Sequence, residues 1–173
     1  GNYAYVADGN SGLQIIDIST PTNPTLTGNY NTSGYASAVT VRGNYAYVAD
    51  GSSGLQIINI SNPFAPIWTA ICNTSGSAMS VAVSGNYAYV ADDNGGLKII
   101  NIDMGHPSYP SVSVTYNTSG WASDVVVRGD YVYVTIGYAG LQIFDISTPT
   151  NPILDATYNT SGDAYGVTVS GNY

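Results

Sequence analysis

Several residue types are rare or missing in this chain of 173 residues. Glutamate is absent, and there is one lysine, one histidine and one cysteine. Helix-forming residues are therefore scarce, whereas valine, isoleucine, threonine and 16 tyrosines favour strands. No apolar run approaches the roughly 20 residues that a membrane-spanning helix needs. The sequence thus predicts an all-β chain without a membrane span, and its 44% hydrophobic content argues against disorder.

Positive charge is also scarce. The basic side chains are Arg42, Lys98 and Arg128 against 11 aspartates, which gives a formal net charge of −8. Nucleic-acid binding needs a cationic surface, so that class of partner is excluded. The low total charge, together with many glycine, serine, threonine, asparagine and tyrosine residues, is more typical of an extracellular or cell-surface protein than of a cytosolic enzyme.

The residues that most often carry catalysis are few. Cys72 is alone, so no disulfide framework or paired-thiol metal site exists, and we expect it to be a small core residue at a strand end. His106 is the single histidine and stands in a proline-flanked segment. No Ser–His–Asp set, His/Cys metal cluster or phosphate-binding glycine loop is visible. The chain is therefore predicted not to be an enzyme and to need no cofactor.

The chain does contain a tandem repeat. The octapeptide GNYAYVAD recurs at spacings of 42 residues, and later copies follow at spacings of 44 and 42. Copies begin at Gly1, Gly43, Gly85 and Gly129, and a fifth starts at Gly171. This period is typical of β-propeller blades, which bury their apolar faces only against neighbours. We predict a single propeller region, 1–173, with repeats 1–42, 43–84, 85–128 and 129–170.

Each repeat is predicted to form four antiparallel strands. In the unit 35–76 these are Ala36–Arg42, Tyr45–Ala49, Leu55–Ile60 and Ile67–Ile71. A Gly-Asn pair favours a tight hairpin between the first two strands. The third strand is apolar on both faces, which is typical of a sheet that is covered on both sides.

Prolines mark the connection before each outer strand. All eight fall in four Pro-x-x-Pro pairs, which favours positions where the chain leaves a sheet, because proline lacks the donor of a strand ladder. The third unit has a two-residue insertion there, within 103–107. A residue that we expect to cap the third strand precedes each connection. These residues are Asp17, Asn59, Asn101 and Asp145.

A second motif, Gly-Leu-Gln-Ile-Ile-Asp, recurs with small variations. It stands at Gly12–Asp17, Gly54–Asn59, Gly96–Asn101 and Gly140–Asp145. With the GNYAYVAD octapeptide and the proline pairs, it makes the chain resemble the LVIVD-repeat proteins over essentially its full length. The resemblance implies a β-propeller of four-stranded blades in secreted or surface-anchored bacterial and archaeal proteins. It implies no catalytic motif that could be transferred to this chain.

The two ends of the repeat array are complementary. Tyr3 already lies in a second strand, while Ala164–Ser170 is an innermost strand with no blade after it. Strand 164–170 therefore completes the blade begun at 3–7, or the corresponding blade of a neighbouring copy. The first case is a closed four-bladed ring. The second is an arc of a seven- to eight-bladed ring, and the repeat number of family members favours it. Because the chain starts at Gly1 rather than Met, we expect it to be processed or excised from a longer array.

One rim of the propeller is predicted to vary most between units. Antiparallel order places the Asp-Gly-x-Ser-Gly and Asn-Thr-Ser-Gly loops on that rim. Aromatic and polar residues on exposed loops are typical of recognition surfaces, although they also fill a rim without binding anything. The candidate ligand-binding residues are Tyr35, Met79, Trp121, Asp124, Asp163 and Tyr165.

Aspartates on the same rim suggest two further chemistries. Asp8, Asp50 and Asp92 are candidate ligands for Ca²⁺, but the loops lack an EF-hand pattern, and turn formation is the alternative role. Asp124 and Asp163 are candidate acid and base for cleavage of a glycan. The leading expectation is a non-catalytic extracellular scaffold that binds a protein or glycan, or associates with itself through open blade edges. A glycan-acting propeller enzyme is the alternative.

Four asparagines match the acceptor pattern for N-glycosylation. Each heads an Asn-Thr-Ser triplet, but one ancestral turn copied four times would give the same matches. These residues are Asn31, Asn73, Asn117 and Asn159.

Overall fold

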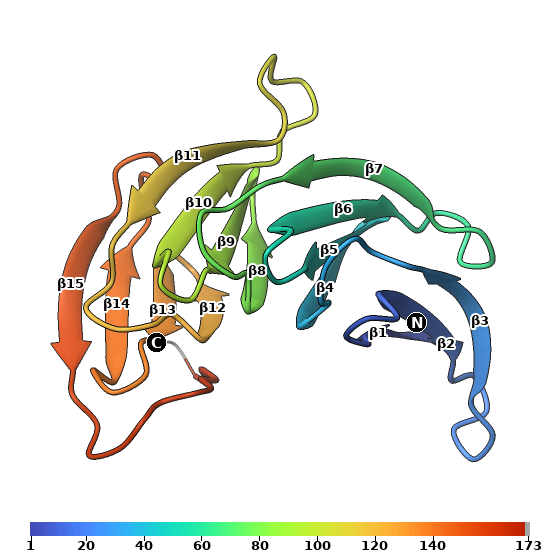
Figure 1. Ribbon diagram of the computed structural model, residues 1–173, viewed down its shortest axis with the longest axis horizontal. Coiled ribbons are helices and arrows are strands. Elements are labelled where there is room, and N and C mark those ends of the chain that lie inside the picture. The colour runs from blue at the N-terminus through green and yellow to red at the C-terminus, as the bar shows by residue number, and fades with distance from the viewer. Residues whose placement is uncertain (172–173) are drawn as a thin grey trace.

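The computed structural model describes residues 1–171, so Asn172 and Tyr173 of the fifth octapeptide copy lie outside the described residues. Residues 1–171 form β-strands joined by turns, and no helix occurs among them. The strands make four antiparallel sheets that follow one another along the chain. In Figure 1 these sheets stand side by side in an open arc, with β1 at one end and β15 at the other. The predicted all-β propeller architecture is confirmed.

The sheets are built in chain order, one repeat after another. The first sheet has three strands, and the other three have four. The first contains β1 (Tyr3–Ala7), β2 (Leu13–Asp17) and β3 (Thr25–Tyr30). The second contains β4 (Ala38–Arg42), β5 (Tyr45–Ala49), β6 (Leu55–Asn59) and β7 (Ile67–Cys72). The third contains β8 (Ser80–Ser84), β9 (Tyr87–Ala91), β10 (Leu97–Asn101) and β11 (Ser111–Tyr116). The fourth contains β12 (Asp124–Arg128), β13 (Tyr131–Thr135), β14 (Leu141–Asp145) and β15 (Ile153–Tyr158).

Local sequence accounts for the hairpins. Gly43, Gly85 and Gly129 have positive φ angles between the first and second strands of their sheets, a conformation that glycine adopts without strain. The register of β4 with β5 runs from Ala38 opposite Ala49 to Arg42 opposite Tyr45. The four strands predicted for unit 35–76 therefore exist, with ends shifted by one or two residues.

The core lies between neighbouring sheets, and each of its three clusters contains the same kinds of side chain. Between the first two sheets, Leu13 and Ile15 of β2 pack against Ala46, Val48 and Ile58. The next two junctions repeat this arrangement with equivalent residues. Because a middle sheet is covered on both faces, β6 and β10 are almost wholly buried. This explains why their sequences are apolar without alternation.

The sheets at the two ends of the arc are covered on one face only. Strands β1, β5 and β9 share the sequence YAYVA, yet β5 and β9 are buried whereas β1 is half-exposed. Val6 is 39% exposed, while Val48 at the same position of the next unit is fully buried. Within residues 1–171, β1 pairs with β2 alone. The segment Ala164–Ser170 lies at the other end of the arc and forms no strand there (Figure 1).

The expected caps before the proline connections are present in every unit. The Oδ1 atom of Asp17 accepts a hydrogen bond from the backbone N–H of Ser19 at 2.7 Å, and Asp145 accepts one from Ser147 at 2.7 Å. Asn59 and Asn101 make the same turn with their amide oxygens. These backbone hydrogen bonds hold the pKa of both aspartates below the ordinary value of 3.8.

A buried aspartate joins consecutive units on the loop rim. Thr32 donates its hydroxyl hydrogen to Oδ1 of Asp50 at 2.5 Å, and the N–H of Gly34 donates to Oδ2 at 2.8 Å. Thr74 and Gly76 bind Asp92 in the same way, with Gly76 also at 2.8 Å. We call this arrangement the Asp–Thr bridge. It connects the loop that leaves one sheet to the second strand of the next sheet.

The third unit adds a buried cation to its Asp–Thr bridge. Lys98 occupies the position of the glutamine found in the other units, and its Nζ lies 3.7 Å from Oδ2 of Asp92. Lys98 and Asp92 are 3% and 0% exposed. The Lys98 ammonium also donates to Ser75 Oγ at 2.7 Å, as the Gln56 amide does to Ser33 Oγ at 3.1 Å. Asp92 is thus paired with a buried cation, whereas Asp50 has no buried cation beside it among residues 1–171.

The caps predict a small acid-sensitive contribution to stability. A carboxyl whose pKa is lowered on folding stabilises the native state above its unfolded pKa, and this stabilisation is lost as pH falls through the folded pKa. We expect the double variant Asp17→Asn/Asp145→Asn to lose less stability than wild type as pH falls below 3.8. Thermal unfolding followed by circular dichroism at pH 6 and at pH 2.5 to 4 measures this. Identical slopes in both proteins would contradict the assignment.

The two Asp–Thr bridges predict unequal costs for one substitution. Isoleucine is the natural choice because Ile136 stands at this position in the fourth unit. Asp92→Ile leaves the buried Lys98 ammonium without its counterion, so it should destabilise by about 2 to 4 kcal/mol more than Asp50→Ile. Adding Lys98→Gln to Asp92→Ile should remove that difference. Urea unfolding of the four proteins gives the free energies, and equal costs for the two isoleucine variants would refute the buried pair.

Candidate functional site

The predicted loop rim exists as one continuous edge of the arc. Backbone bridges join Gly9 to Ala36 and Gly51 to Ala78, and each pair connects a loop after a second strand with the segment before the next first strand. Asp93 with Ala122 and Gly137 with Ala164 continue the series. The Asp-Gly-x-Ser-Gly and Asn-Thr-Ser-Gly loops therefore share this rim. The Gly-Asn turns and proline connections lie together on the opposite rim, where Gly85, Asn86 and Pro149 line one groove.

Aromatic side chains project from this rim at several units. Tyr35 is 59% exposed and Tyr165 is 68% exposed, and Met79 is 40% exposed at the position that Tyr165 occupies in its own unit. Trp121 is half-buried, with its ring edge-to-face against Tyr138 at a centroid distance of 5.1 Å. Such rings offer rigid contact area together with polar edges, which suits recognition of another molecule.

Trp121 is held in place by its surroundings. A Cβ atom on Gly137 would lie 2.2 Å from the indole, so the absence of a side chain there lets the ring pack on the backbone. The Tyr138 hydroxyl donates to the backbone oxygen of Ser119 at 2.8 Å. Sequence reasoning missed Tyr138 as a site residue. It could have been found as a departure from the repeat, because the other units have asparagine or serine at that position.

The two aspartates proposed as acid and base differ in their environments. Asp124 accepts three hydrogen bonds, from Ser80 Oγ at 2.6 Å, Val125 N at 2.9 Å and Val167 N at 2.9 Å. Asp163 is exposed, and its carboxylate accepts from the Tyr165 hydroxyl at 3.4 Å. Asp124 thus connects the first strands of neighbouring units with the C-terminal segment. Its oxygens are occupied by structural donors.

The candidate calcium ligands are distributed over three units. Asp50 and Asp92 are fully buried within Asp–Thr bridges, and Asp8 is exposed at the first unit. Among residues 1–171, no three histidine, cysteine, aspartate or glutamate side chains gather closely enough to hold a metal ion. The buried pair has a structural role that the loop sequences did not reveal.

The four Asn-Thr-Ser triplets have exposed asparagines and engaged hydroxyls. Asn31, Asn73, Asn117 and Asn159 all lie at the surface. In the first and second triplets the threonine hydroxyl donates to the aspartate of an Asp–Thr bridge, and the serine hydroxyl accepts from a glutamine or lysine. The triplet therefore has a structural reason to recur that is independent of any glycan.

Cysteine and histidine are not part of the exposed surface of this rim. Cys72 ends β7 and is 6% exposed, as predicted for a core residue, and burial raises the pKa of its thiol. His106 lies in the inserted connection of the third unit, exposed, where its Nδ1 accepts from the N–H of Ser108 at 3.2 Å. Among the hydrogen bonds of residues 1–171, none joins Cys72 or His106 to a second nucleophilic or basic side chain.

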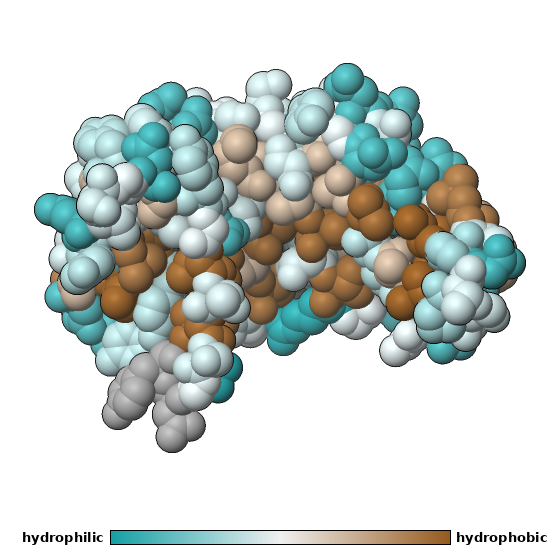
Figure 2. Space-filling view, turned by 90° about the horizontal axis from the view of Figure 1, so that it is seen from below, coloured by the Kyte–Doolittle hydropathy of each residue, from teal (hydrophilic) through white to brown (hydrophobic). Residues whose placement is uncertain are grey.

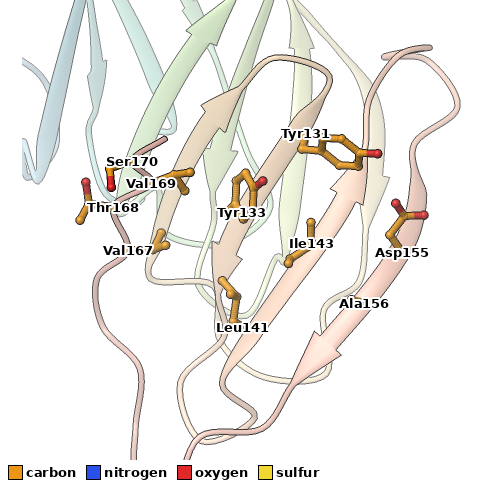
Figure 3. Close-up of a pocket in the computed structure, with 10 residues that line it drawn as sticks. All are labelled: Tyr131, Tyr133, Leu141, Ile143, Asp155, Ala156, Val167, Thr168, Val169 and Ser170. Atoms are coloured by element: carbon orange, nitrogen blue, oxygen red, sulfur yellow. The ribbon is translucent and has the colours of Figure 1, made fainter. Parts of the chain in front are cut away.

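An apolar groove lies at the C-terminal end of the arc rather than on the rim. It has a volume of about 540 Å³ and lies between the fourth sheet and the segment 167–170. Figure 3 shows Tyr131, Tyr133, Leu141 and Ile143 projecting from β13 and β14, with Val167 on the opposite side. Sequence reasoning did not single out this groove, because its residues are those that form the core in the other units.

Two solved structures are similar to this chain in fold. One is the computationally designed Ika8 protein, with a TM-score of 0.78 and 10% identity, covering 99% of this chain and 51% of that chain. The other is the Cps50 (Swd1) β-propeller domain of Myceliophteria thermophila, with a TM-score of 0.74 and 10% identity, covering 92% of this chain and 55% of that chain. The chain thus spans about half the length of each. No curated protein matches it in sequence.

A family model resolves the chain into four consecutive units. The model is that of the LVIVD repeat, and it matches residues 1–32, 33–74, 75–118 and 119–160. These units agree in number with the four sheets and include the Gly-Leu-Gln-Ile-Ile-Asp strands that carry the resemblance. Within residues 1–171, no helix is long and apolar enough to cross a membrane. The chain belongs to the LVIVD-repeat family and forms a β-propeller module of four units.

Proposed function

We propose that this module is a non-catalytic binding unit of an extracellular or cell-surface protein, and that it holds a protein or glycan partner on its loop rim. One observation carries the proposal: exposed or half-exposed aromatic side chains stand at equivalent rim positions of a rigid repeated scaffold. Tyr35 and Trp121 occupy one of these positions in two different units, and Tyr165 lies two residues beyond the same position in the last unit. Function in propellers and other repeat folds commonly resides in such variable loop positions.

The scaffold supports this role by fixing the rim backbone. The bridges of Gly9, Gly51, Asp93 and Gly137 and the Asp–Thr bridges hold the loops of neighbouring units together. Rim side chains therefore lie on a preorganised surface, which lowers the entropy lost on binding. The acidic, lysine-poor composition and the scarcity of histidine and cysteine support an extracellular binding role in preference to catalysis.

The second candidate is a propeller enzyme that cleaves a glycan with rim aspartates. Its requirement is a pair of carboxyl groups that both reach the substrate. Asp163 is exposed and meets that requirement, whereas the Asp124 carboxylate is already bound by two backbone N–H groups and a serine hydroxyl. This geometry favours the binding role.

Replacing the aromatic rim residues should weaken recognition without harming the fold. Ser77 stands at the position of Tyr35 and Trp121 in the remaining internal unit, so serine is compatible with the local backbone. We expect the Tyr35→Ser/Trp121→Ser double variant to bind its partner at least about tenfold more weakly than wild type. A glycan array and a panel of purified extracellular proteins identify the ligand, and calorimetry measures the affinity.

Phe64→Ser provides a matched control for this experiment. Phe64 is 71% exposed on a proline connection of the opposite rim, so its loss removes a similar aromatic surface from the other side of the molecule. The control should bind as wild type does. Equal binding by the rim variant, or equal loss in the control, would refute the rim as the recognition surface.

Asp163→Asn distinguishes the enzyme from the binding module. If Asp163 acts as acid or base, the variant should lose glycan cleavage by about 10² or more. We expect instead that wild type releases no reducing ends from a polysaccharide panel and that Asp163→Asn has the same structure and stability. Turnover by wild type that disappears in the variant would overturn the proposal.

A further inference from the structure

We infer that two copies of this chain close into one ring, in which the fourth sheet of each copy packs against the first sheet of the other. This inference concerns the ends of the arc and is independent of what the rim binds. The two end sheets each have one uncovered apolar face, in a chain whose middle sheets are covered on both. A second copy carries the matching faces.

The uncovered face of the fourth sheet is equivalent to a face that is buried elsewhere in the same molecule. Leu141 and Ile143 occupy the positions of Leu13 and Ile15, which are both fully buried in the first junction. Tyr131 and Tyr133 likewise repeat the tyrosines of β1 that line that junction. At the end of the arc these four side chains line the open groove instead (Figure 3).

The uncovered face of the first sheet is the other half of the same junction. Val6 is 39% exposed and Ile18 is 38% exposed, whereas the equivalent Val48 and Ile60 are 0% and 6% exposed. Ala4 and Ile16 belong to the same face, by analogy with the buried Ala46 and Ile58. Hydrophobic residues gather on the open side of the arc over several sheets (Figure 2). Three internal junctions of identical design therefore define how the two end faces pack together.

The C-terminal segment is already placed for this contact. Arg128 donates to the backbone oxygen of Gly171, as Arg42 does to that of Gly85 at an internal junction. Ala164 forms the rim bridge with Gly137, and Val167 N–H binds Asp124. The segment 164–170 thus follows the course of an innermost strand, although no strand within residues 1–171 pairs with it. By the register of β4 with β5, Val167 should lie opposite Val6 of the other copy.

Polar groups at the two ends are complementary as well. Asp8 stands at the position of Asp50 and Asp92 but is exposed, and within residues 1–171 no threonine hydroxyl donates a hydrogen bond to it. Thr160 stands at the position of Thr32 and Thr74, and its hydroxyl binds the oxygen of Gly162 at 2.6 Å instead. Thr118, which faces Ile136 in place of an aspartate, makes the same local bond. Thr160 of one copy and Asp8 of the other therefore complete an Asp–Thr bridge.

The size of the arc supports two copies rather than one. The chain covers 55% of the length of the similar propeller domain, and its ends lie apart in Figure 1. A head-to-tail contact produces a closed ring when the rotation per copy divides a full turn, and an arc of about half a turn closes with two. The contact is not driven by charge, because each copy carries a formal charge of −8. Apolar burial must offset that repulsion, so higher salt should strengthen the dimer.

Sedimentation equilibrium of the 173-residue chain tests the proposal. We expect a dimer of twice 18.0 kDa, and a dissociation constant at least about a hundredfold higher for Val6→Asp, which places an unpaired charge in the junction. Val6 is partly exposed in the single copy, so the variant should keep its fold by circular dichroism. Phe64→Asp, an equally non-conservative change at an exposed site outside the junction, should dimerise as wild type does. A monomer at all concentrations, or polymers larger than two copies, would overturn the ring.

Cross-linking tests the register. The Val6→Cys/Val167→Cys variant should form an intermolecular disulfide under mild oxidation, giving a dimer on non-reducing gels, because facing residues of paired strands lie within disulfide reach. Cys72 is buried and remains as an internal control. The single variants should stay monomeric on the same gels. A disulfide within one chain would instead establish closure of a four-bladed ring and overturn the proposal.

Discussion

The structure depends on one requirement: every sheet has two apolar faces, and both must be covered. A single unit cannot meet it, because the strands of one sheet lie side by side and cover neither face of their central strand. Leu55, Ile57 and Ile58 of β6 are fully buried because the first and third sheets cover opposite faces of the second. Lateral stacking of identical units therefore stabilises the middle of the arc and leaves its ends incomplete.

Much of this architecture could be predicted from the sequence because it is local and repeated. The Gly-Asn hairpins, the proline connections and the caps at Asp17 and Asn59 each follow from the conformational preferences of a few residues. Repetition strengthens these predictions, since similar signals recur from unit to unit. Membership in the LVIVD-repeat family and the four-unit propeller agree with that expectation.

The parts that could not be predicted are contacts between units. Asp50 and Asp92 resemble surface turn residues in sequence, but a threonine 18 positions earlier draws them into the interior. The sequence predicts Asp124 as a rim residue, whereas its carboxylate accepts hydrogen bonds from groups that lie 44 and 43 residues away. Lys98 is likewise buried through contacts with Asp92 and Ser75 that its local sequence does not show. Such roles depend on how one unit faces the next, and no local pattern in a single unit reveals that geometry.

Positions where the units differ in sequence can be divided into those that make structural contacts and those that are available to bind a partner. The Asp–Thr bridge recurs because its residues recur, and where Ile136 replaces the aspartate, Thr118 makes a local hydrogen bond instead. The rim position occupied by Tyr35, Ser77, Trp121 and Asp163 does not require one residue type for folding, because four chemically different side chains are accepted on one backbone, with Trp121 packed on Tyr138 in the fourth unit. A position that folding does not constrain is available for recognition, and the aromatic residues placed there expose surface that folding alone would have favoured burying.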